Sequence, residues 1–370
     1  MSVVALPQPE SPTYPKHLLK EIMEQPEVLA ACMNGRLDAV HKRVLFPELD
    51  AFPVPEVIRI AACGSSAHAG MWGGAQIESL AAIPVITDIA SETRYRTPVF
   101  LKNEIALVIS QSGESADTLA VVRHLKEADR RIIALTSTPD SRLAAAADIT
   151  LLAASGKETA VPATKSLSAQ MIYLLMLAVY WARRKETLTA ADCAALLEDL
   201  LQLPETVAFS LPETKNTARA LALKYKNFRH FFFAGRGLNY PLALEGALKF
   251  KEITYIHAEG LSLGSIPHGA RTLLDESAPV FALALPDRHL PRTIQDLNAL
   301  KQQGCKIIAL CNPGQIPGAG DLWQLPPACG PCSAFLALPA LQLFAYEIGM
   351  ALNRNVDTPR ALHKAVTETD

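Results

Sequence analysis

A hydroxyl-rich turn in the first half of the chain has the composition of an anion-binding loop. The segment SQSGES at residues 110–115 follows an apolar run, Ile105–Ile109, and precedes an amphipathic stretch, Ala116–Ala128. A glycine-containing turn at the start of a helix directs backbone N–H groups and the positive end of the helix dipole at one point. Serine and glutamine side chains add neutral donors, so this turn can hold a phosphate group without a lysine.

A second turn of this kind, CGSS at residues 63–66, follows the apolar run Val57–Ala62. Because neighbouring parallel strands end at the same edge of a sheet, the two turns are expected to form one ligand crevice. Each turn alone is also explained by helix capping, but the pair favours phosphate binding. After the later run Val280–Leu285 the chain has PDRH at 286–289 instead. We therefore expect one phosphate site per chain.

Three charged residues in the second half share one helical face. Glu245, Lys249 and Glu252 are spaced at i, i+4 and i+7. A solvated ladder of ion pairs is the ordinary outcome of this spacing. That solvated ladder is the favoured interpretation, and the strongly apolar neighbours leave open the alternative of an enclosed face, where a carboxylate with a raised pKa can act as a base. The preceding GRG at 235–237 lacks the third glycine of a dinucleotide-binding fingerprint.

Three further features could carry chemistry. His268 lies in a glycine-bounded loop, and Lys364 lies near the C-terminus between apolar residues, where a desolvated amine could form a Schiff base. Cys329 and Cys332 form a CGPC sequence, as in thioredoxin-like dithiols, but the flanking strand and tryptophan of that site are absent. A zinc site would need a second, closely spaced cysteine pair. We expect no metal and no other cofactor.

The elements around these residues predict an α/β fold. Short runs rich in β-branched residues alternate with helical patterns, which is typical of parallel strands buried on both faces. The same plan returns in the second half, so we expect two tandem three-layer αβα units, each with a mainly parallel sheet. The expected strands are 57–62, 105–109, 132–136 and 149–153 in the first unit, and 231–234, 280–285, 307–311 and 322–325 in the second.

The organisation along the chain follows from these elements. Residues 1–45 are expected to form an N-terminal arm with a helix, 46–185 the first unit with the phosphate site, 186–226 a helical linker punctuated by prolines, 227–350 the second unit with the base, and 351–370 a C-terminal tail. The apolar stretch Leu167–Ala182 has 16 residues, shorter than the roughly 20 that a membrane span requires. It is therefore predicted to be a buried core helix.

Composition excludes several classes of protein. Hydrophobic residues make up 49% of the 370 residues and charged residues 19%, which excludes a disordered chain. The formal net charge of −2 gives no electrostatic reason to expect a nucleic-acid or membrane partner. The seven cysteines are scattered and odd in number, which favours thiols in a reducing compartment. With no signal sequence visible at the start, a cytoplasmic protein is expected.

These motifs together resemble the sugar isomerase (SIS) family, in particular its double-domain members. Those include SIS-type glucosamine-6-phosphate deaminases and the isomerase half of glutamine–fructose-6-phosphate aminotransferase. The resemblance runs from about residue 14 to 366. It rests on motifs in the family's order: EIMEQPEVL at 21–29, ACGSSAHAG at 62–70, ASETRYR at 90–96, SQSGESADT at 110–118, LEGALKFKEITYIHAE at 244–259 and the segment around the terminal lysine.

The resemblance implies roles for individual residues. Glu252 matches the base that moves a proton between C1 and C2 of the sugar. His268 matches the residue that opens the sugar ring, contributed by the neighbouring subunit of a homodimer with shared active sites. Lys364 matches the amine that engages the ketose carbonyl. Substrate-binding positions are implied for Ser65, Ser66, Ser110, Gln111, Ser112, Ser115, Val161, Lys249 and Glu245.

The resemblance implies an amino-sugar phosphate deaminase/isomerase that converts an aminohexose 6-phosphate to fructose 6-phosphate and ammonia. The sequence has no glutaminase half, and Ser2 stands where that half begins with cysteine, so the ammonia-releasing direction is expected. Alternatives are a deglycase or isomerase for another, amine-substituted sugar phosphate, a lone aminotransferase-type isomerase, a sugar-phosphate sensor without turnover, and a CGPC oxidoreductase. The chain departs from the family in GSIPHGA at 264–270, which lacks the usual carboxylate, and at Pro162, where a small residue is common.

Overall fold

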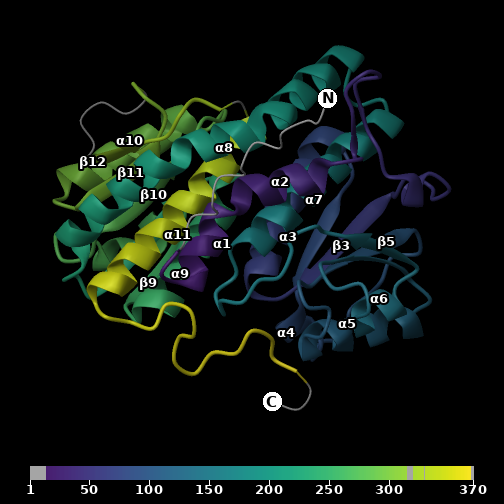
Figure 1. Ribbon diagram of the computed structural model, residues 1–370, viewed down its shortest axis with the longest axis horizontal. Coiled ribbons are helices and arrows are strands. Elements are labelled where there is room, and N and C mark those ends of the chain that lie inside the picture. The colour runs from purple at the N-terminus through teal and green to yellow at the C-terminus, as the bar shows by residue number, and fades with distance from the viewer. Residues whose placement is uncertain (1–13, 315–319, 329, 368–370) are drawn as a thin grey trace, which may run out of the picture.

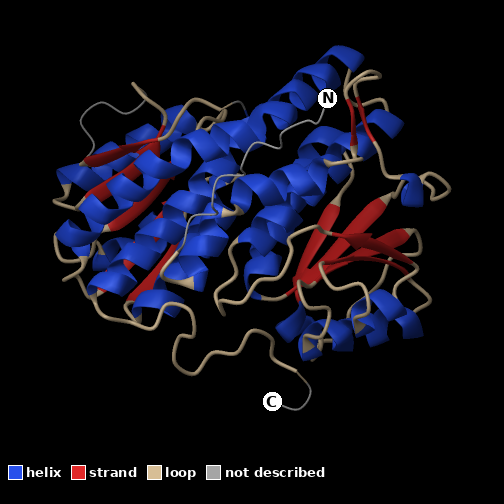
Figure 2. Cartoon of the chain, viewed as in Figure 1, coloured by secondary structure: helices blue, strands red, loops and turns tan. Residues whose placement is uncertain are grey.

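The computed structural model describes residues 14–314, 320–328 and 330–367 and contains two parallel sheets. Figure 2 shows the sheets on opposite sides of a central layer of helices. Each of the two has five strands, ordered β4-β3-β5-β6-β7 and β9-β8-β10-β11-β12. The predicted α/β class and the two tandem units are therefore confirmed.

Both sheets have the same topology. In the first, β3 (Val57–Ala62) lies between β4 (Val85–Ile89) and β5 (Glu104–Ile109); in the second, β8 (His230–Gly235) lies between β9 (His257–Ser262) and β10 (Val280–Ala284). After the first strand of each unit, β3 or β8, the next strand pairs on one side of it and the strand after that pairs on the other side. Loops that follow the strands at such a point form the usual ligand crevice of an open α/β sheet.

The remaining strands extend each sheet on the far side of that point. They are β6 (Arg131–Thr136), β7 (Ile149–Leu152), β11 (Ile307–Cys311) and β12 (Asp321–Gln324), and a small hairpin, β1 (Leu37–Asp38) with β2 (Arg43–Val44), precedes the first unit. The eight strands predicted from apolar runs are all present, with their ends shifted by at most one residue. The sequence analysis missed β4 and β9, which pair on the other side of β3 and β8.

Helices cover both sheets and fill the space between them (Figure 1). The α-helices are α1 (His17–Met23), α2 (Gln25–Met33), α3 (Gly64–Ala81), α4 (Ala90–Thr93), α5 (Ala116–Glu127), α6 (Arg142–Ala146), α7 (Lys165–Arg184), α8 (Ala190–Tyr225), α9 (Asn239–Thr254), α10 (Leu290–Gln302) and α11 (Ser333–Ala351). Short 3-10 turns are η1 (Pro47–Leu49), η2 (Ile266–His268), η3 (Ala270–Leu273) and η4 (Gly330–Cys332).

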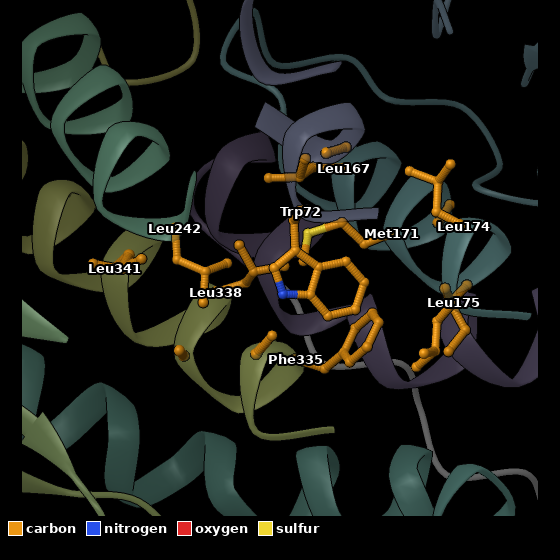
Figure 3. Packing of buried hydrophobic residues seen from close by; sticks show 14 of the residues in the cluster. Trp72, Leu167, Met171, Leu174, Leu175, Leu242, Phe335, Leu338 and Leu341 are labelled. Carbon is orange, nitrogen blue, oxygen red and sulfur yellow. The ribbon is translucent and has the colours of Figure 1, made fainter. Parts of the chain in front are cut away.

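The central helices form the main hydrophobic core. Figure 3 shows Trp72 of α3 packed among side chains of α7 and α11, with Phe335 at a ring-centroid distance of 5.7 Å. The prediction that 167–182 is a buried core helix is confirmed, because every residue of that stretch is buried in α7. In the described part of the chain, 330–351 is long and apolar enough to cross a membrane, but most of it is buried in this core.

Close packing of α3 on α7 depends on Gly73. A Cβ atom built at this position would lie 2.5 Å from the Cβ of Leu174. Alanine normally stabilises a helix relative to glycine by about 1 kcal/mol. We expect Gly73→Ala to lower the free energy of unfolding instead, by about 1–3 kcal/mol, because overpacking outweighs helix propensity. Urea denaturation tests this, with Ser79→Ala on the exposed face of α3 as the control; equal stability of G73A and the wild type would contradict the packing argument.

The segment predicted as a helical linker forms one long helix. The segment is helical as predicted, and α8 continues through Pro204 and Pro212 instead of ending at them. The buried residues of α8 recur every three or four positions on both sides of the prolines, at 200, 203, 207, 211, 214 and 218. Neither proline belongs to this buried face, so packing sustains the helix where local propensity opposes it.

Candidate active site

A cavity of about 320 Å³ opens at the carboxyl edge of the first sheet. Both hydroxyl-rich turns contribute to it, as do the segment before α7, one face of α9 and the C-terminal tail. The residues that line it are 63–66, 109–112, 115, 117, 118, 158, 161, 163, 166, 167, 170, 249, 252 and 362–366. The cavity thus joins side chains of the first unit to charged groups of the second.

The turn at 110–115 is held in a cup by its own hydrogen bonds. Gly113 N donates to Ser110 Oγ at 3.1 Å, and the hydroxyls of Ser110 and Ser115 lie 3.4 Å apart. Ser115 precedes the first residue of α5, and its side chain makes no capping bond. That hydroxyl and the N-terminus of α5 therefore face the cavity together, which favours an anionic ligand at this point.

Gly113 has a left-handed backbone conformation within this turn and no room for a side chain. Its φ is +68°, and a Cβ at this position would lie 2.1 Å from Ser141 Oγ. We expect Gly113→Ala to raise the KM for a phosphorylated substrate by about tenfold or more, because a left-handed conformation costs roughly 1–2 kcal/mol and the clash adds to it. Gly156→Ala is the matched control: its φ is +64° and the nearest atom to its Cβ lies 3.8 Å away. Equal KM values for G113A and G156A would contradict this account of the turn.

The charged face of α9 is enclosed, so the interpretation as a solvated ladder is wrong and the enclosed alternative is the one observed. Lys249 is fully buried, with Nζ 2.5 Å from Glu252 Oε2 and 3.8 Å from Glu245 Oε1. The contact to Glu252 is an ion pair without hydrogen-bond geometry. Burial by itself lowers the pKa of Lys249, but the charges of Glu252 and Glu245 outweigh it and the net pKa is raised. Lys249 is therefore a cation that orients the carboxylate of Glu252.

Glu245 ties α9 to α3 and does not line the cavity. Its Oε1 accepts from Ser65 Oγ at 2.9 Å, and its Oε2 lies 2.7 Å from His68 Nδ1. Ser65 does line the cavity, but its hydroxyl proton points at Glu245. Glu245 therefore lies behind the cavity wall, where its contacts support the helix that carries Glu252.

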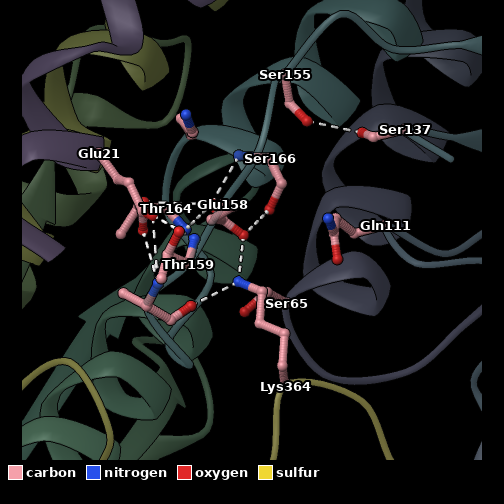
Figure 4. Close-up of polar contacts among 12 residues, drawn as sticks. Glu21, Ser65, Gln111, Ser137, Ser155, Glu158, Thr159, Thr164, Ser166 and Lys364 are labelled. Atoms are coloured by element: carbon pink, nitrogen blue, oxygen red, sulfur yellow. Dashed lines mark hydrogen bonds and ion pairs between the residues drawn. The ribbon is translucent and has the colours of Figure 1, made fainter. Parts of the chain in front are cut away.

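The C-terminal tail crosses the mouth of the cavity. Lys364 Nζ donates to Glu158 Oε2 at 2.6 Å and to the backbone oxygen of Ala160 at 2.7 Å (Figure 4). Burial in itself raises the pKa of Glu158, but the Lys364 ammonium and the donors of Ser166 reverse this, so the pKa is lowered. The Glu158 carboxyl is accordingly ionised at neutral pH.

The structure brings most of the sequence-derived site residues together. Those at the cavity wall are Ser65, Ser66, Ser110, Gln111, Ser112, Ser115, Val161, Lys249, Glu252 and Lys364. His268 is the other exception besides Glu245: it is exposed at the end of η2 and does not line the cavity of its own chain.

Sequence reasoning missed several residues of the site. Glu158 and Asp117 line the cavity, with Asp117 held by Arg94 at 2.6 Å, and His363 lies beside Lys364 in the tail. His68 supports Glu245 from α3. Glu158 lies in the mixed segment AASGKETAVPAT at 153–164, just before the core helix, where its neighbours Lys157 and Thr159 give it the pattern of an ordinary loop residue.

The CGPC pair lies only partly within the described residues. Cys329 lies outside them, so the CGPC pair is not described, and Cys332 is buried. In 14–314, 320–328 and 330–367, no three His, Cys, Asp or Glu side chains gather as metal ligands would.

Comparisons with known proteins agree with this architecture. A glutamine–fructose-6-phosphate aminotransferase (isomerizing) from Clostridium tetani is 37% identical over 361 residues, which is 96% of this chain and 59% of that protein. The chain therefore spans about three fifths of the length of the curated relatives it matches.

Solved structures extend the likeness to the whole fold. The C-terminal domain of glucosamine-fructose-6-phosphate aminotransferase from Francisella tularensis has a TM-score of 0.88 and 30% identity, over 94% of this chain and 100% of that one. Glucosamine-6-phosphate deaminase from Thermotoga maritima shares the fold, with a TM-score of 0.73 and 22% identity over 95% of this chain and 99% of that one. The SIS domain model matches residues 55–180 and 224–317, one stretch in each sheet-containing unit. Two such units build the cavity, one with its hydroxyl turns and the other with its charged helix. The chain therefore belongs to the SIS family.

Proposed function

We propose that this protein is a phosphosugar isomerase that acts as an amino-sugar phosphate deaminase, with glucosamine 6-phosphate as the expected substrate. The observation that carries the proposal is one cavity in which the Ser110–Ser115 turn, the carboxylate of Glu252 and the amine of Lys364 meet. The cavity can hold an anion at the turn and offers a carboxylate and an amine at its other end. This arrangement suits a sugar phosphate that reacts at C1 and C2.

The proposed binding step uses the first unit. The turn hydroxyls and the start of α5 hold the phosphate, with Ser66, Gln111 and Ser112 around it. Val161 presents backbone to the sugar. In this arrangement the phosphate end fixes the position of the chain, and the carbons at the other end reach α9.

The proposed chemistry begins with the open-chain amino aldose. Glu252 removes the proton from C2, which gives an enolamine, and returns it to C1, which gives a C2 ketimine. The Lys364 amine then adds to C2 and expels ammonia, and water hydrolyses the resulting Schiff base to the ketose. The sum is amino aldose phosphate plus water to ketose phosphate plus ammonia.

Ring opening is assigned to His268 of a neighbouring subunit. The histidine is exposed and absent from its own cavity, so a homodimer with shared sites would supply it. Mixing inactive E252Q and H268A subunits tests this: recovery of activity on mixing is expected, and no recovery with stable mixed dimers would overturn shared sites.

Ammonia release is the direct test of the proposal. Purified protein with glucosamine 6-phosphate is expected to form fructose 6-phosphate and ammonia in equal amounts, measured by coupled assays. Unphosphorylated glucosamine is the control for the phosphate requirement. Tight binding of the sugar phosphate without product would instead indicate a sensor.

A second candidate is isomerisation in the aminotransferase direction, with ammonia or an amine donor as co-substrate. The identity of 37% to an isomerizing aminotransferase favours keeping it. Incubation of fructose 6-phosphate with ammonium salts, with detection of glucosamine 6-phosphate, distinguishes the two directions by their relative rates.

A further inference from the structure

Glu158 is a fully buried carboxylate that the proposed chemistry does not use. Its side chain has no exposed surface. Oε1 accepts from Thr164 N at 2.9 Å, from Thr164 Oγ1 at 3.3 Å and from Ser166 N at 3.1 Å. Oε2 accepts from Ser166 Oγ at 2.7 Å and from Lys364 Nζ at 2.6 Å (Figure 4). The start of α7 therefore fixes this carboxylate rigidly, with one oxygen directed at the tail.

The tail is attached on both sides of this ion pair. Val161 N donates to the backbone oxygen of Asp357 at 2.8 Å, and Ala116 N donates to that of Val366 at 3.0 Å. Between these points residues 358 and 360–363 are exposed and Pro359 is buried, and the side chain of Lys364 is 28% exposed. Within this segment Arg360 N also donates to Tyr255 Oη at 2.8 Å. The charged anchor of this exposed segment is therefore a residue that also lines the cavity.

We propose that Glu158 is the positioning residue of Lys364, a fixed seat that holds the tail across the cavity and keeps the amine within reach of a bound carbonyl. When the amine bonds to the ligand, Glu158 keeps its donors from Thr164 and Ser166 but loses its cation. A buried carboxylate without a cation is costly, so release of product returns Lys364 to the seat.

Glu158→Gln separates the seat from the loop around it. The amide oxygen can replace Oε1 and keep the bonds from Thr164 and Ser166. The amide NH2 then occupies the place of Oε2, where it can donate to Ser166 Oγ but repels the ammonium of Lys364. The variant is therefore expected to keep the fold and release the tail.

Limited digestion of the unliganded protein with an arginine-specific protease tests the seat without any assumption about activity. Cleavage after the exposed Arg360 is measured by intact mass in wild type, E158Q, K364M and the double variant. E158Q and K364M are each expected to be cleaved about tenfold or more faster than wild type. The double variant should be cleaved no faster than K364M, because both substitutions remove the same ion pair and K364M also removes the bond to the Ala160 carbonyl. Cleavage of K364M at the wild-type rate, or a roughly hundredfold faster cleavage of the double variant, would contradict the role proposed for Glu158. The result for K364M decides the question even if E158Q fails to fold.

The catalytic half of this inference rests on the proposed function. With an active enzyme, E158Q is expected to lower kcat by about tenfold or more with KM nearly unchanged, since the phosphate turn is untouched. Borohydride trapping of the ketose phosphate on Lys364 should fall in parallel. Normal trapping and kcat in E158Q with a released tail would overturn the positioning role alone, whereas absence of turnover in the wild type would count against the proposed function and leave the digestion result standing.

Discussion

Replacing Glu252 by glutamine is expected to lower kcat by about 10²–10⁴-fold, the usual contribution of a positioned general base. Glutamine has nearly the same shape as glutamate but cannot accept the C2 proton. Glu252 lines the cavity beside Lys249 and is 18% exposed at its side chain, so the substitution leaves the phosphate turn untouched. Binding of the sugar phosphate, measured by calorimetry, should change by less than about threefold.

Glu259→Gln is the matched control for this variant. Glu259 lies on β9, the strand that follows α9, and is exposed. Its substitution is expected to leave both kcat and binding unchanged. Turnover of E252Q within a few-fold of wild type would exclude Glu252 as the base, and loss of binding together with turnover would show that the carboxylate acts in binding.

Lys249→Met is expected to lower the free energy of unfolding by about 3–5 kcal/mol, because it leaves buried carboxylates without their cation. Glu245 is 2% exposed at its side chain, and Glu252 is paired directly with Lys249. The raised pKa of Lys249 means that its contribution is complete below the ordinary lysine pKa of 10.5 and is lost only as pH rises through the raised value. Urea denaturation at neutral pH therefore measures the full effect.

Lys251→Met provides the comparison, since Lys251 is exposed on the same helix. Its effect should stay within about 0.5 kcal/mol, as for most surface substitutions. Equal stability of K249M and K251M would contradict the view that α9 carries a compensated buried charge cluster. We also expect kcat of K249M to fall, because Glu252 loses the cation that orients it.

The sequence predicts the buried strands well and the edge strand β4 and its counterpart β9 poorly. Every residue of β5, β10 and β11 is buried, and such strands are visible as continuous apolar runs. In β4 (VITDI) only one residue is buried. In β9 (HAEGLS) two residues are buried, and polar residues and a glycine stand between them. Their strand character comes from pairing with β3 and β8, which local composition does not encode.

The candidate site divides in the same way. The hydroxyl turns are predictable because strand ends, glycine and serine lie together in the sequence. The pairs that join distant segments are not: Ser65 with Glu245 is separated by 180 residues, and Glu158 with Lys364 by 206. Burial of Lys249 likewise depends on how α9 packs against α3 and α11, so its ladder has the same sequence pattern as an exposed one.

A crystal structure of E252Q with glucosamine 6-phosphate is the most direct examination of the arrangement proposed for this cavity. We expect the phosphate oxygens to accept hydrogen bonds from the Ser110–Ser115 turn and the start of α5, with C1 and C2 beside the side chain at position 252 and near Lys364. A phosphate bound elsewhere, or a sugar whose C1–C2 end points away from α9 in both subunits, would contradict it.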